Sequence, residues 1–148
     1  MSSDRVVIDT NVFIRHGLDR LADRGPLSAV VLQEITAGAT DSSAVRDLGL
    51  LGQQLERRGR LLVPTGEDWF YAGKVLNALY RGLRSRRSRE RVVIPKDEQQ
   101  RLVRDVLIAR SAKRVNAAVV TYNRSDFEKI GRFCSVRLME PERLLEAA

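Results

Sequence analysis

The chain of 148 residues is poor in cysteine, histidine and lysine, and it has no long apolar run. Its single cysteine, Cys134, excludes an internal disulfide and a cysteine-rich metal site. No apolar run approaches the roughly 20 residues of a membrane-spanning helix, and the N-terminus lacks the basic start and apolar core of a signal peptide. No GxGxxG or P-loop pattern supports a nucleotide cofactor. We therefore expect a cytoplasmic protein without a membrane partner.

The composition is that of an ordinary globular protein with an excess of arginine. The length of 148 residues predicts a single domain over residues 1–148, and 43% hydrophobic and 30% charged residues fit an ordinary globular protein. The formal charge is +7, and arginine supplies 22 of the 26 basic residues. A positive surface rich in arginine favours a polyanionic partner, because the guanidinium group binds phosphate in a bidentate manner. The alternative is that the arginines only cover a solvated face.

Apolar runs alternate along the chain with amphipathic stretches of helical period. Strands are expected at residues 5–8, at Leu27, and at residues 60–64, 117–121 and 135–139. Helices are expected at residues 10–21, 29–38, 43–58, 67–83, 96–115 and 125–130, and from residue 141 onward, with an interruption over residues 84–95. This alternation predicts an α/β fold, a three-layer α/β/α sandwich around a mostly parallel sheet of four to five strands.

Polar residues follow two of the expected strands at their carboxyl ends, where ligands bind in open parallel sheets. Asp9 ends the first strand. Thr121 ends the strand AAVVT, and Asn123 and Asp126 lie in the loop after it. The structural alternative is that Asp9 caps the next helix and that the second group forms an ordinary turn.

Two further acids interrupt apolar helical stretches. Glu34 lies in VVLQEITAG and Asp105 in LVRDVLIAR. A buried unpaired carboxylate is unfavourable, so each should be exposed, paired or bound to a cation. Glu34 is compatible with a solvated position at the margin of the core, and Asp105 with a salt bridge to Arg101 or Arg104. If these acids meet at one edge of the sheet, their oxygens suit Mg²⁺ or Mn²⁺, which can activate water for phosphodiester cleavage.

Four segments in this order resemble the PIN-domain nucleases, and most of all the VapC-type toxins of bacterial toxin–antitoxin modules. They are Asp9–Phe13, Leu32–Ile35, Asp105 with Ile108 and Ala109, and Thr121–Phe127. The resemblance implies a PIN-like fold and a Mg²⁺- or Mn²⁺-dependent endoribonuclease that acts on tRNA or rRNA. It also implies a small antitoxin protein as partner and a homodimer.

The resemblance also assigns roles to residues of this chain. Asp9, Glu34 and Asp105 match the acidic triad of the family. Many members carry a fourth acid two residues after the threonine that ends the fourth strand, where this chain has Asn123. Asp126 is then the candidate for the missing charge, so the expected catalytic set is Asp9, Glu34, Asp105 and Asp126, and the expected metal ligands are Asp9, Asp105, Asn123 and Asp126. Thr10, Asn11 and Thr121 are expected to orient these groups by hydrogen bonds.

The segment RGLRSRRSRERV at residues 81–92 is the densest run of positive charge in the chain. We expect its arginines to contact RNA phosphates, namely Arg84, Arg86, Arg87, Arg89 and Arg91. The alternatives are a solvated loop or a segment that becomes ordered on an acidic part of an antitoxin. For the whole chain, the alternative function is a catalytically weak PIN-like module that binds RNA or a partner, and Asn123 is the main argument for it.

Overall fold

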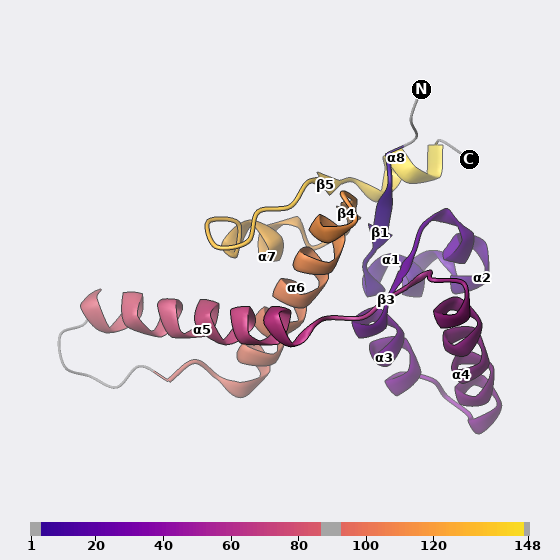
Figure 1. Cartoon of the computed structure of the whole chain (residues 1–148), viewed down its shortest axis with the longest axis horizontal. Coiled ribbons are helices and arrows are strands. Elements are labelled where there is room, and N and C mark those ends of the chain that lie inside the picture. The colour runs from indigo at the N-terminus through magenta and orange to yellow at the C-terminus, as the bar shows by residue number, and fades with distance from the viewer. Residues whose placement is uncertain (1–3, 87–92, 147–148) are drawn as a thin grey trace.

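The computed structural model describes residues 4–86 and 93–146, with the side chains of residues 83–86 excepted. The described strands are β1 (Val6–Ile8), β2 (Leu27–Ser28), β3 (Leu61–Leu62), β4 (Ala118–Val120) and β5 (Leu138–Met139). The described helices are α1 (Thr10–His16), α2 (Leu18–Leu21), the 3₁₀ turn η1 (Ala22–Arg24), α3 (Ala29–Ala37), α4 (Ser42–Arg57), α5 (Gly66–Arg86), α6 (Lys96–Arg114), α7 (Arg124–Lys129) and α8 (Pro141–Glu146). Helices and strands therefore mix along the whole chain (Figure 1).

All strand pairs described here are parallel, and they form two small sheets. One sheet has the order β1-β4-β5, with Val7 opposite Val119, and the other pairs β2 with β3. The prediction of an α/β fold with parallel strands is confirmed, whereas a single sheet of four to five strands is not found in the described part. The reason is local, because β2 lies beside β1 but makes its ladder with β3.

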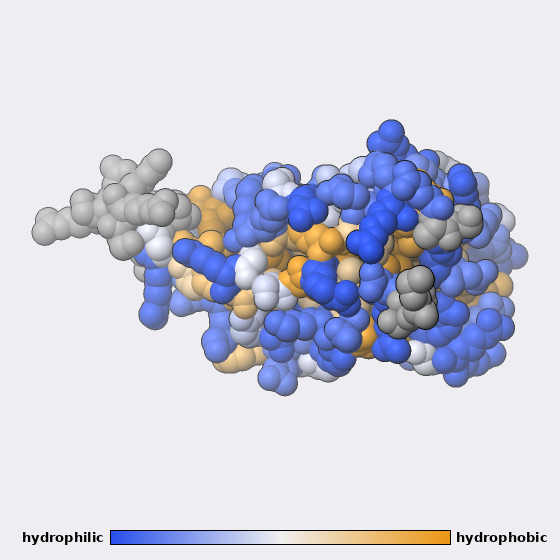
Figure 2. Space-filling view, turned by 90° about the horizontal axis from the view of Figure 1, so that it is seen from above, coloured by the Kyte–Doolittle hydropathy of each residue, from blue (hydrophilic) through white to orange (hydrophobic). Residues whose placement is uncertain are grey.

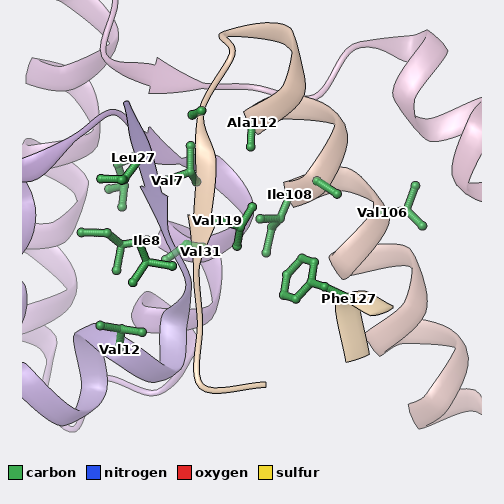
Figure 3. Close-up of a cluster of buried hydrophobic side chains, with 14 of the residues drawn as sticks. Val7, Ile8, Val12, Leu27, Val31, Val106, Ile108, Ala112, Val119 and Phe127 are labelled. Atoms are coloured by element: carbon green, nitrogen blue, oxygen red, sulfur yellow. The ribbon is translucent and has the colours of Figure 1, made fainter. Parts of the chain in front are cut away.

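The apolar strands β1 and β4 are completely buried between helices. In Figure 3, Ile108 of α6 packs toward Val119 on β4, and Val31 of α3 lies beside Ile8 on β1. This cluster of apolar side chains extends from β1 to α8. Burial on both faces explains why β1 and β4 read as continuous apolar runs instead of alternating ones.

Several expected elements differ in extent from those of the structure, and three of these differences have a clear local description. The helix expected at residues 10–21 is interrupted at Gly17, whose φ of 95° does not continue a right-handed helix. Helix α5 continues to Arg86, beyond the expected end at residue 83. The last strand is limited to Leu138 and Met139, because only these two residues pair with β4.

The surface is dominated by polar and charged residues, with apolar side chains visible along the middle of the face in Figure 2. Exposed large apolar residues include Trp69 and Phe70 on α5 and Val63 before it. Among the residues that the structure describes, no helix is long and apolar enough to cross a membrane.

Candidate active site

Asp9 lies at the carboxyl end of β1 and is fully buried. Its backbone N–H still donates to the carbonyl oxygen of Val120, so the strand pairing fixes its position. Its Oδ1 atom accepts a hydrogen bond of 2.8 Å from the backbone N–H of Thr10, which makes Asp9 the N-cap of α1. The structural alternative for Asp9 is therefore correct, but capping occupies only part of this carboxylate.

The second carboxylate oxygen of Asp9 faces β4. Thr121, which follows β4, donates its hydroxyl to Oδ2 of Asp9 at 2.8 Å, and the side-chain amide of Asn11 donates to the same oxygen at 3.3 Å. Thr121 is buried, so this bond forms in a region from which water is excluded. Thr121 and Asn11 hold the carboxylate of Asp9 in one orientation, and their role in a reaction stays a prediction.

Glu34 and Asp105 lie on helices that face this strand end. Glu34 of α3 accepts a hydrogen bond of 3.1 Å from the hydroxyl of Thr10, and its side chain is 28% exposed. Asp105 of α6 is almost completely buried, with 2% of its side chain exposed. The three acids expected to form a triad thus belong to three different elements that meet at one end of the sheet.

One guanidinium group joins these three acids. Arg104 donates from Nη2 to Asp9 at 2.7 Å and from Nη1 to Asp105 at 3.0 Å, and its Nε donates to Glu34. Each nitrogen of the guanidinium therefore contacts a different carboxylate. We call Arg104 and its three acids the Arg104 cluster. The expected salt bridge of Asp105 with Arg101 or Arg104 is thus found with Arg104, whereas no sequence pattern predicts the contacts of Arg104 with Asp9 and Glu34.

The Arg104 cluster contains more negative than positive charge, and this affects the pKa values of its members. Burial raises the pKa of Asp105 to about 7; Arg104 opposes this shift, while the charges of Asp9, Asp126 and Glu34 add to it. Burial alone would lower the pKa of Arg104, but the neighbouring carboxylates reverse this effect and raise it. The cluster therefore favours additional positive charge.

The two candidates for a fourth ligand lie at different positions. Asp126, in the first turn of α7, lines a small hollow together with Asp105, and its carboxylate lies 3.8 Å from the ammonium of Lys129. Asn123 is exposed, and its backbone N–H donates to the hydroxyl of Thr121 at 2.9 Å. Asp126 is thus close enough to influence Asp105, whereas Asn123 contributes a backbone bond to the support of Asp9.

The donor chemistry of the Arg104 cluster fits a hard divalent cation, because Mg²⁺ and Mn²⁺ prefer carboxylate oxygens. In the observed arrangement, however, the carboxylates surround a guanidinium group. Over residues 4–86 and 93–146, no group of three or more His, Cys, Asp or Glu side chains is placed to hold a metal ion. The residues match the cation in kind, and their present arrangement matches the larger guanidinium group.

Two other features adjoin the Arg104 cluster. The first is an aromatic rim, in which His16 Nε2 and the Tyr122 hydroxyl lie 2.5 Å apart and the Arg15 guanidinium stacks 4.9 Å from the centre of the Tyr122 ring. The second is a hollow of about 830 Å³, which we call the apolar groove. Most of its lining residues are apolar, and Arg104 is one of the polar ones. The lining consists of Ala29, Val30, Gln33, Val63, Pro64, Trp69, Leu76, Lys96, Gln99, Gln100, Val103, Arg104 and Leu107.

The arginines expected to contact RNA lie outside this description. Arg87, Arg89 and Arg91 are not among the described residues, and for Arg84 and Arg86 only the backbone, at the end of α5, is described. Their assignment to RNA binding stays a prediction.

Comparison with solved structures identifies chains of the same fold. A chain in the crystal structure of DNA-bound VapBC from Salmonella typhimurium shares 21% identity, with 94% of this chain and 99% of that chain covered and a TM-score of 0.52. A chain in the structure of VapBC-1 from nontypeable Haemophilus influenzae shares 18% identity, with 93% and 98% covered and a TM-score of 0.52. No family model and no curated protein matches the chain.

This chain has the fold of a chain in VapBC complexes. The resemblance drawn from four short segments is thereby confirmed at the level of the fold. Because the likeness covers nearly the full length of both chains, it concerns the whole α/β arrangement around the Arg104 cluster and not one shared motif.

Proposed function

We propose that the protein is a metal-dependent endoribonuclease that hydrolyses phosphodiester bonds in RNA. The observation that carries this proposal is the meeting of Asp9, Glu34 and Asp105 around one cationic group at the carboxyl ends of β1 and β4. Carboxylates are seldom gathered in this way for stability alone, because each added negative charge disfavours the ionised form of the others. A centre that requires positive charge suits the binding of a cation.

The chain's own residues would position that cation and the substrate. Asp9, Asp105 and Asp126 would hold Mg²⁺ or Mn²⁺, with Glu34 at its side. When bound, such an ion activates a water molecule and stabilises the negative charge that develops on the phosphodiester. Thr10, Asn11 and Thr121 keep Asp9 and Glu34 fixed by the hydrogen bonds described above. Asn123 supports the same place through its bond to Thr121.

The substrate that best fits this chain is a structured RNA such as tRNA or rRNA. The net charge of +7 favours a polyanion. Its phosphates would be contacted by the arginines of the basic segment, namely Arg84, Arg86, Arg87, Arg89 and Arg91. The Tyr122 ring, on which Arg15 stacks, lies near the Arg104 cluster, because the backbone N–H of Tyr122 donates to the side chain of Asn11. Contacts of this kind position RNA without reading its sequence.

We propose further that the protein is the toxin of a type II toxin–antitoxin pair, acts in the cytoplasm and forms a homodimer. The support is the shared fold with chains in VapBC complexes and the apolar groove beside the Arg104 cluster. A groove bordered by Val63, Trp69 and Val103 fits an apolar segment of a small antitoxin protein. A segment in this place would also restrict access to the acids.

The test is cleavage of total tRNA and rRNA by the purified protein with Mg²⁺, with Mn²⁺ or with EDTA. We expect discrete fragments that require metal and that disappear with Asp9→Asn, a variant that keeps the shape of the helix cap. Glu56→Gln is the matched control, because it removes an exposed carboxylate on α4, away from the Arg104 cluster. Equal cleavage by Asp9→Asn and Glu56→Gln would contradict the proposal.

A second candidate function is a catalytically weak PIN-like module that binds RNA or a partner. Two observations favour it: Arg104 already neutralises part of the acidic cluster, and the position of the fourth acid holds Asn123, which is exposed. In that case the purified protein would bind RNA with every metal tested and leave it intact, and Asp9→Asn would bind it equally well.

A further inference from the structure

We propose that Arg104 is an internal cation of the acidic cluster, and that Mg²⁺ or Mn²⁺ binds there only in exchange with its guanidinium group. This inference rests on the metal site of the proposed function. The guanidinium contacts all three acids at once, so its departure would change the charge and the spacing of the whole cluster.

The hydrogen bonds of Asp9 show why the two cations exclude one another. An ionised carboxylate offers about four acceptor positions. Those of Asp9 are taken by the Thr10 N–H and Arg104 on Oδ1, and by Thr121 and Asn11 on Oδ2. A divalent ion that binds within about 2.1 Å of an oxygen must replace one of these donors.

Among the four donors to Asp9, Arg104 is the one most able to leave. The Thr10 N–H belongs to the first turn of α1, and Thr121 is buried at the end of β4. The Arg104 side chain is long, 18% exposed and able to rotate without moving the backbone. It carries the only positive charge of the four donors, so repulsion by an incoming divalent ion acts on it first.

The released side chain has a place to go. Arg104 also borders the apolar groove, whose lining includes the amide residues Gln33, Gln99 and Gln100. Amide oxygens can accept hydrogen bonds from a guanidinium group. The exchange therefore requires a rotation of one side chain, with the backbone of α6 left in place.

The first test measures the affinity for Mn²⁺ by isothermal titration calorimetry, in the absence of RNA. We expect Arg104→Gln to bind Mn²⁺ at least about tenfold more tightly than the wild type, because a competing unit charge is removed from the site. Arg101→Gln is the matched control: it removes the same charge from an exposed position on α6, beside the hollow that Asp105 lines. Equal affinities of Arg104→Gln and Arg101→Gln would overturn the proposal, since general electrostatics would then explain any gain.

The second test uses the wild-type protein and does not depend on the folding of a variant. The Nε–Hε NMR signal of Arg104 reports directly on the guanidinium that contacts Glu34. Saturation with diamagnetic Mg²⁺ should move this signal to the position of a solvent-exposed arginine and increase its exchange with water. An unchanged signal while calorimetry records bound Mg²⁺ would overturn the proposal.

These readouts separate the inference from the proposed function. Exchange of Arg104 with Mg²⁺ in a protein that cuts no RNA would support the inference and contradict the nuclease. Metal-dependent cleavage together with an undisturbed Arg104 signal would support the nuclease and overturn the inference. Absence of Mg²⁺ and Mn²⁺ binding in both wild type and Arg104→Gln would overturn the inference as well.

Discussion

Helix α6 takes part in two buried clusters of arginine and carboxylate that differ in their balance of charge. In the Arg104 cluster, one guanidinium forms ion pairs with three acids. At the other position, which we call the Asp68 cluster, one acid is paired with two arginines, Arg110 and Arg114. Guanidinium and carboxylate groups therefore meet at two places along α6 in opposite proportions.

In the Asp68 cluster, both oxygens of the single carboxylate accept hydrogen bonds. Although burial acts to raise the pKa of Asp68, the bonds from Arg114, the Thr65 N–H and Arg110 lower it to about 2. Thr65 and Asp68 also exchange hydrogen bonds at the start of α5, in the manner of a capping box. The Arg110 guanidinium stacks 4.3 Å from the centre of the Tyr71 ring, which fixes it further.

Both sites contain salt bridges, and they differ in the ratio of positive to negative charge. Asp68 has more positive charge around it than it needs, so its carboxylate stays ionised and attaches α5 to α6. Asp105 has too little positive charge around it to offset its burial, and its pKa lies near 7. Strongly raised pKa values of buried acids are typical of sites that bind cations or move protons.

The largest effect is expected when equal substitutions are made in the two clusters. Asp105→Asn should lower RNA cleavage on the order of 100-fold or more, the scale on which preorganised charges act in catalysis. Asp68→Asn should leave the cleavage rate of the folded protein unchanged, because Asp68 pairs with Arg110 and Arg114 in the last part of α6 and has no bond to the Arg104 cluster among the described contacts. Cleavage assays on both variants, corrected for the folded fraction, check this. Equal losses in the two variants after this correction would contradict a role in cleavage that Asp105 has and Asp68 lacks.

Stability should respond in the opposite way. Asp68→Asn leaves Arg110 and Arg114, whose side chains are 24% and 41% exposed, without their shared partner. Because these arginines reach water, the expected loss is that of hydrogen bonds between charged groups, about 2 kcal/mol. Asp105→Asn removes one of three adjacent negative charges, so the free energy of unfolding should stay equal or rise. Urea denaturation followed by circular dichroism measures both. A loss in Asp105→Asn as large as in Asp68→Asn would contradict the assignment of roles.

A smaller effect is expected from the group that orients Asp9. Thr121→Val keeps the shape of the side chain but removes the hydroxyl that donates to Asp9 Oδ2. Loss of such a supporting bond lowers activity or metal affinity about tenfold or somewhat more. Thr65→Val is the control: it removes the hydroxyl that accepts from the backbone N–H of Asp68, and it should leave cleavage by the folded protein unchanged. Cleavage rates of both variants at one metal concentration decide the matter.

The location of the Arg104 cluster could be predicted from the sequence, because it depends on short-range patterns. A buried apolar strand that runs into Asp9 places that acid at the carboxyl end of the sheet. Asp105 lies among apolar residues of a long helix, so its burial follows from the helical period. The segments around these two acids supported the resemblance that the fold confirms.

The partners of the buried acids could not be predicted, because they depend on distant parts of the chain. Arg104 reaches Asp9 across 95 positions and Glu34 across 70 positions of the sequence. Asp68 lies in the first turn of α5, and its partners follow 42 and 46 residues later. A long flexible arginine can reach several acids, and only the packing of α3 and α6 decides which ones.

The dependence of stability on pH compares the two clusters within a single protein. The pKa of Asp105 is raised from 3.8 to about 7, so the folded protein holds an extra proton between these values and its stability should fall as the pH rises from 4 to 7. The pKa of Asp68 is lowered to about 2, so its contribution is present above pH 4 and is lost as the pH falls toward 2. One proton gives a slope of at most about 1.4 kcal/mol per pH unit.

Urea denaturation at a series of pH values tests both slopes. The slope between pH 4 and pH 7 should disappear in Asp105→Asn, and the slope below pH 4 should disappear in Asp68→Asn. If stability still falls between pH 4 and pH 7 in Asp105→Asn, a group other than Asp105 holds the extra proton of the folded protein.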